Sequence, residues 1–138
     1  MPQENVEIIR RVNAAFNSGD WDGWLPLFDP GFVYYEGASY LDTPSVIRGR
    51  DQFRSAIESY GAELEGFRGD IVELINADDR VLCLTRWSGT GRSSGLRVEM
   101  LEAIVFTIRD GRIIEGRAFS DRAEALEALG LSEQDAQG

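Results

Sequence analysis

The second half of the chain constrains the fold most, because four strand-like segments follow one another there with only short turns between them. These segments are rich in β-branched and apolar residues, and they cover residues 67–76, 81–90, 96–108 and 113–120. Asp110 and Gly111 form the dipeptide typical of a two-residue hairpin. Short turns join antiparallel neighbours, so this half predicts an antiparallel meander. Strands this long in a 138-residue chain must twist and curl.

The first half predicts helices. Apolar residues recur every three or four positions over residues 4–17, which is typical of an amphipathic helix. The other expected elements are helices over 21–28, from Asp51 to about Leu64, and from Asp121 to Gly130, a strand over 32–36 and a loop over 37–49. Segregated helices and strands indicate the α+β class, with helices covering one face of an antiparallel sheet.

One domain is expected over residues 1–131, followed by a flexible polar tail over 132–138. The N-terminal residues do not resemble a secretory signal, and no apolar run approaches the ~20 residues that a membrane span needs. These features predict a cytoplasmic protein with no membrane partner. The single cysteine, Cys83, excludes an internal disulfide.

The residue counts restrict the chemistry further. The chain has no histidine and no lysine, so all 14 basic residues are arginine. Without histidine there is no Ser-His or Cys-His pair and no zinc site of the usual kinds, and without lysine there is no Schiff base. We therefore expect no cofactor and no metal, and any acid–base step must use carboxylates. A net charge of −10 also argues against a nucleic-acid partner.

Five short motifs then suggest a family: Phe16-Asn17-Ser18-Gly19-Asp20-Trp21-Asp22, Leu27-Phe28-Asp29-Pro30, Ile47-Arg48-Gly49-Arg50, residues 106–113 and residues 125–131. Together, over about residues 4–131, they resemble the SnoaL-like branch of the nuclear-transport-factor-2-like superfamily. The resemblance implies a cone-shaped curved antiparallel sheet wrapped around three helices, a cystatin-like α+β barrel with a deep apolar pocket. It also implies homodimers that form through the outer face of the sheet.

Glu36 is the first candidate catalytic residue. The resemblance aligns it with the general-base carboxylate of ketosteroid isomerase, and a carboxylate on a pocket wall would have a raised pKa. The alternative is a solvated glutamate at a strand end.

Glu102 is the second candidate. Alternate residues of a strand lie on the same face, so Glu102 shares a face with the apolar Met100, Ile104 and Phe106. If that face lines the cone, Glu102 would stand inside an apolar wall. The alternatives are a structural ion pair, or an outward glutamate if a bulge shifts the register.

Arg86 is the third candidate. It shares parity with Leu82 and Leu84, the set that the resemblance aligns with the pocket, and it would orient one carboxylate, bind a developing oxyanion or hold an acidic ligand. The alternative is an outward arginine beside Trp87.

Two departures from ketosteroid isomerase matter. Val12 and Ile104 occupy the positions of its oxyanion-hole tyrosine and aspartate, and neither can donate a side-chain hydrogen bond. Steroid isomerisation by that mechanism is therefore not expected. Trp87 and Phe119 have the parity of the outer sheet face, where exposed aromatic residues would suggest a dimer surface.

The predicted function follows from these residues and the resemblance. The chain is expected to bind a small, largely apolar or amphipathic molecule and to act as a cofactor-independent isomerase or cyclase through carboxylate acid–base chemistry. The alternative is a non-catalytic ligand-binding or dimerisation module. The residues expected to line the pocket are Val12, Phe16, Trp24, Tyr34, Phe53, Ile57, Tyr60, Leu84, Ile104 and Phe106, with Tyr34 or Tyr40 as a phenolic donor.

Overall fold

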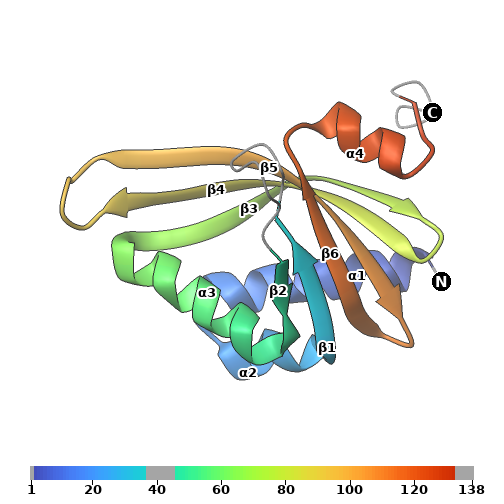
Figure 1. Ribbon diagram of the computed structural model, residues 1–138, viewed down its shortest axis with the longest axis horizontal. Coiled ribbons are helices and arrows are strands. Elements are labelled where there is room, and N and C mark those ends of the chain that lie inside the picture. Colours follow the sequence, from blue (N-terminus) through green and yellow to red (C-terminus); the bar gives the residue numbers. More distant parts are fainter. Residues whose placement is uncertain (1, 37–45, 133–138) are drawn as a thin grey trace.

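The computed structural model describes residues 2–36 and 46–132. It contains four α-helices, one short 3₁₀-helix and six strands in these residues (Figure 1). In chain order the elements are α1 (Pro2–Asn17), α2 (Trp21–Trp24), η1 (Leu25–Leu27), β1 (Phe28–Tyr35), β2 (Val46–Arg48), α3 (Gly49–Glu63), β3 (Leu64–Ala77), β4 (Arg80–Gly91), β5 (Arg97–Arg109), β6 (Arg112–Phe119) and α4 (Arg122–Ala128).

The six strands form one open, curved sheet in the order β2-β1-β6-β5-β4-β3. Helices α1, α2 and α3 lie below the sheet in Figure 1, and α4 lies above it. The α+β class and the curved sheet around three helices are thus confirmed. One detail differs from the sequence prediction, because β1 pairs with β6 in parallel and makes the sheet mixed.

Most element ends follow from local sequence signals. Asp121 accepts a hydrogen bond from the Glu124 amide at 2.8 Å, as expected of an N-cap. Asp110 (φ 53°) and Gly111 (φ 77°) both have left-handed backbone, which is the conformation of the predicted hairpin turn. The segment 37–49, predicted as a loop, instead ends in the short strand β2 and the start of α3. The rest of that loop, with Tyr40, and the tail beyond Ser132 lie outside the described residues.

Two apolar cores pack on opposite faces of the sheet. The larger core fills the concave face beneath α1–α3 and includes the fully buried Trp24 and Phe28. The smaller core lies between the sheet and α4, where Leu82, Val105 and Leu126 belong to one buried cluster. Strands β4 and β5 therefore bury side chains on both faces, and the concave face is the one that carries the cavity described next. Within the described residues, no helix is long and apolar enough to cross a membrane.

Candidate functional site

A cavity of about 460 Å³ opens on the concave face, between the sheet and helices α1 and α3. Its wall is mostly apolar and includes nine aromatic side chains, which are Phe16, Trp24, Phe28, Tyr34, Phe53, Tyr60, Phe67, Trp87 and Phe106. Three exposed apolar side chains line one end of it: Tyr60 on α3, and Val98 and Met100 on β5. A volume of this size suits a small organic molecule.

Glu102 brings a carboxylate into this apolar wall. Its Oε1 accepts a hydrogen bond from the Trp87 indole Nε1 at 2.9 Å and from the Tyr34 hydroxyl at 3.5 Å. The second distance is long for a hydroxyl donor, so the Trp87 bond is the stronger of the two. Among the described residues, both hydrogen bonds go to Oε1 and none goes to Oε2.

Burial is the main cause of the altered acidity of this group. It raises the pKa of Glu102 above its usual 4.5, although the hydrogen bonds from Trp87 and Tyr34 act in the opposite direction. The negative charge of Glu36 raises the pKa of Glu102 further. Burial and the charge of Glu102 also raise the pKa of Tyr34 well above 10, so the phenol stays protonated at neutral pH.

Two glycines make room for the rings that hold Glu102. Gly69 pairs with Trp87 across β3 and β4, and a Cβ on Gly69 would lie 2.8 Å from the indole ring. Gly116 pairs with Tyr34 across β6 and β1, and a Cβ there would lie 2.9 Å from the phenol ring. Any larger residue would displace the ring above it, so these glycines fix the positions of both hydrogen-bond donors.

Helix α1 holds the first of these glycines in place. The Asn17 Nδ2 donates to the Gly69 carbonyl at 2.7 Å, and its Oδ1 accepts from the Gly69 amide at 3.0 Å. This pair of bonds lies just beyond a bulge in β3, where the ladder between β3 and β4 is interrupted. The roles of Asn17 and of the two glycines were not predicted from the sequence, because they depend on which helix and strands lie side by side in the fold.

The structure brings together most of the residues that the sequence analysis selected. Glu36 and Glu102 both line the cavity, as do Val12, Phe16, Trp24, Tyr34, Phe53, Ile57, Tyr60, Ile104 and Phe106. Their catalytic and binding roles stay predictions. The hydroxyl of Tyr34, one of the two predicted phenolic donors, bonds to Glu102, and the charge of Glu36 also acts on it.

Arg86 and Leu84 are not at the cavity, and the expectation that they face it was wrong. Arg86 is exposed on the convex face, and Leu84 is buried beneath α4. The reason is the register of β4 and β5. Thr90 pairs with Arg97, so opposed residues have numbers of opposite parity, and Arg86 is opposite Leu101. With Glu102 facing the cavity, Arg86 must face away from it.

The same register corrects the position of Trp87, which was expected on the outer face. Trp87 instead lines the cavity, with its ring stacked on Phe67 at 5.4 Å between centroids. Phe119, the other residue expected there, packs against the core beneath α4. Phe119 thus lies on the outer face as expected, but α4 covers it. Trp87 lies on the face opposite to the expected one because Thr85 pairs with Glu102, so Thr85 and Trp87 share the cavity face with Glu102.

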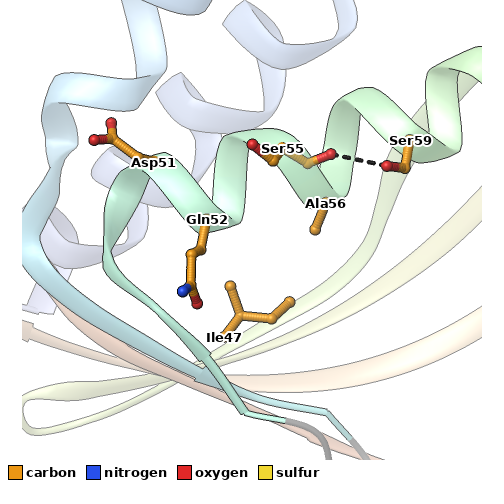
Figure 2. Close-up of a pocket in the computed structure, with 6 residues that line it drawn as sticks. All are labelled: Ile47, Asp51, Gln52, Ser55, Ala56 and Ser59. Carbon is orange, nitrogen blue, oxygen red and sulfur yellow. Dashed lines mark hydrogen bonds between the residues drawn. The ribbon is translucent and has the colours of Figure 1, made fainter.

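A second hollow of about 480 Å³ lies between α3 and β2. Figure 2 shows its lining, which consists of Ile47, Asp51, Gln52, Ser55, Ala56 and Ser59. The Ser59 hydroxyl donates to the Ser55 carbonyl at 3.0 Å, so this polar group is paired within the helix (Figure 2). Within the part of the chain that the structure describes, no three acidic or cysteine side chains come together as a metal site requires.

Comparison with solved structures defines the class first. Bal32a, from a soil-derived mobile gene cassette, is 30% identical, with a TM-score of 0.75 over 85% of this chain and 88% of that one. A nuclear-transport-factor-2-like protein from Burkholderia thailandensis is 25% identical, with a TM-score of 0.73 over 91% and 96% of the two chains. The protein therefore has the nuclear-transport-factor-2-like fold.

A third structure shares this fold at lower identity. It is a Catenulispora acidiphila protein with a ketosteroid isomerase-like fold, solved in complex with trimethylamine; it is 19% identical, with a TM-score of 0.71 over 91% and 93% of the two chains. That likeness concerns the fold alone.

A family model narrows this fold to one family. The model of the SnoaL-like domain matches residues 9–116, and the chain belongs to this family. None of the curated protein sequences matches the chain.

Proposed function

We propose that this SnoaL-like protein is a cofactor-independent enzyme that moves a proton on a small, largely apolar molecule, with Glu102 as the general base. The observation that carries the proposal is a carboxylate anchored by Trp87 at 2.9 Å inside an apolar cavity. Desolvation raises the pKa of Glu102 above its usual 4.5, and a carboxylate with a raised pKa is a stronger base.

The proposed step begins with a C–H bond next to a substrate carbonyl. The proton passes to the Glu102 carboxylate, and the electron pair of the C–H bond moves to form an enolate. Once Glu102 holds the substrate proton, Tyr34, which keeps its own proton, turns its single O–H from Glu102 to the enolate oxygen and donates a hydrogen bond to it. Returning the proton at another carbon completes an isomerisation. Attack of the carbanion on a second carbonyl carbon forms a C–C bond and an alkoxide, and the alkoxide takes the proton back from Glu102 to complete a cyclisation.

Proton exchange tests this proposal. In D₂O, the wild type is expected to accelerate deuterium incorporation into apolar ketones such as 2-tetralone and benzoylacetone, measured by NMR. Glu102→Gln keeps the shape and removes the base, and it should lower the rate by about 10²–10⁴-fold. The matched control is Glu99→Gln, on the same strand but exposed, which should leave the rate unchanged.

Two results would contradict the proposal. One is equal exchange by the wild type and Glu102→Gln. The other is no acceleration by the wild type although the ketones bind in the cavity, which would favour the non-catalytic ligand-binding module instead.

A further inference from the structure

The charges around the cavity all have one sign. Two of its 25 lining residues, Glu36 and Glu102, are acidic, and none is basic. The chain has no lysine and no histidine, and its 14 arginines all lie within the described residues. No cationic side chain of this protein therefore lines the cavity with Glu102.

The arginines are used elsewhere on the molecule. Arg122 binds Glu73 at 2.6 Å, and Arg68 binds Asp70 at 2.7 Å. Arg54 lies over the Trp21 ring at 4.8 Å. The cavity carboxylates have no such partner among the described residues, although a buried carboxylate is expensive without a counter-charge.

The hydrogen bonds to Glu102 do not neutralise the charge of its carboxylate. Both donors, Trp87 and Tyr34, are neutral groups, and both bind Oε1. Glu36 lies near enough for its charge to act on both Glu102 and Tyr34. A positive group placed between the two carboxylates would relieve their mutual repulsion and would supply the missing counter-charge.

The surrounding wall suits an organic cation rather than a hydrated inorganic one. Aromatic rings attract cations through their negative faces, and nine line this cavity. Three of them pack together beside the site, since Phe16 contacts Trp87 at 5.7 Å and Phe67 stacks on Trp87 at 5.4 Å between ring centroids. The exposed Tyr60, Val98 and Met100 continue this apolar wall to the surface.

We propose that the cavity selects an organic monocation, a tertiary or quaternary amine with an apolar body, whose charged nitrogen lies between Glu36 and Glu102. The apolar body contacts Phe16 and Phe67, and anionic molecules of the same size are excluded. The proposal deepens the proposed function by naming the class of ligand for the same cavity, but it concerns binding and requires no reaction.

Three probes of similar size but different charge test the selection. They are the cation phenyltrimethylammonium, its neutral isostere tert-butylbenzene and the anion benzenesulfonate. Binding is measured through the fluorescence of Trp24 and Trp87, which both line the cavity. We expect the cation to bind at least ten-fold more tightly than the neutral isostere, and the anion to bind more weakly than either.

Charge-removing variants locate the effect. In Glu102→Gln the preference for the cation should fall to three-fold or less, and Glu36→Gln should lower it less, because Glu36 is not held by the rings that fix Glu102. The control Glu99→Gln should keep the full preference. Unchanged binding of tert-butylbenzene by each variant shows that the cavity is still formed.

The outcomes are distinct. Equal or tighter binding of the neutral isostere or the anion by the wild type would overturn the proposal, and so would a cation preference that survives removal of both carboxylates. Cation selection without any proton exchange on a panel of ketones would sustain this inference and refute the proposed enzyme. Proton exchange on neutral ketones without cation selection would do the reverse.

Discussion

Glu102 shows how a single residue couples the site to the stability of the fold. Its carboxylate is desolvated by the apolar wall, and its nearest charged neighbour in the cavity, Glu36, is also negative. Both effects favour the protonated form, so the pKa of Glu102 in the folded chain lies above the usual 4.5. The same environment that makes this carboxylate a better base therefore makes its ionised form cost stability.

Because the ionised form of Glu102 destabilises the fold, the free energy of unfolding should depend on pH. Between pH 4.5 and the raised pKa, the folded chain holds a proton on Glu102 that the unfolded chain has released. The free energy of unfolding therefore falls as the pH rises through this window, by at most about 1.4 kcal/mol per pH unit. Glu102→Gln does not titrate and should lose less stability from pH 4 to pH 8 than the wild type or Glu99→Gln. Urea unfolding at several pH values measures this, and parallel curves for all three proteins would contradict it.

Helix α4 shows how an element can depend on its contacts. It has seven residues, fewer than an isolated helix needs to be stable in water. Its position is set by Ala125 and Leu126, which are fully buried against the convex face of the sheet, and by the ion pair of Arg122 with Glu73. That ion pair lowers the pKa of Glu73, but its side chains are partly exposed, so the apolar contacts dominate.

Leu126→Ala tests this account of α4. Leu126 is 1% exposed, so truncation leaves a void beneath the helix, and we expect it to lower the free energy of unfolding by about 2–4 kcal/mol. The cavity lies on the other face of the sheet, so ligand binding under native conditions should not change. Urea unfolding and tryptophan fluorescence measure the two quantities. The exposed Glu127→Ala on the same helix is the control, and an equal loss of stability there would contradict the account.

At the scale of the whole molecule, the homodimer through the outer sheet face stays a prediction. The two aromatic residues that first suggested it do not lie exposed on that face, since Trp87 lines the cavity and Phe119 packs beneath α4. The convex face beyond α4 instead presents Leu101, 51% exposed, beside its strand neighbour Arg86. An apolar centre with charged neighbours is typical of an interface of modest size.

Leu101→Glu tests this surface. We expect the wild type to sediment with twice the 15.4 kDa mass of one chain, and the variant to sediment as a monomer because a buried carboxylate would lack a partner. Val72→Glu, at an exposed residue on a different strand, serves as the control and should remain a dimer. A monomeric wild type would refute the prediction, and a dimeric Leu101→Glu would place the interface elsewhere.

The sequence by itself determined most of the elements and the class of fold. Periodicity, the cap at Asp121 and the turn at Asp110 and Gly111 are local signals, because each depends on residues within a few positions of one another. The absence of histidine and lysine, also readable from the sequence, restricted acid–base chemistry to carboxylates.

Only the tertiary structure decided which residues meet at the site. The face on which a strand residue lies depends on the pairing register, and the pairing of Thr85 with Glu102 places Trp87 on the cavity face and Arg86 on the convex face. The residues that line the cavity come from α1, α2, α3 and six strands, and their meeting depends on the curvature of the sheet. Glu102, Trp87 and Tyr34 therefore form one site through long-range packing, which no local pattern in the chain specifies.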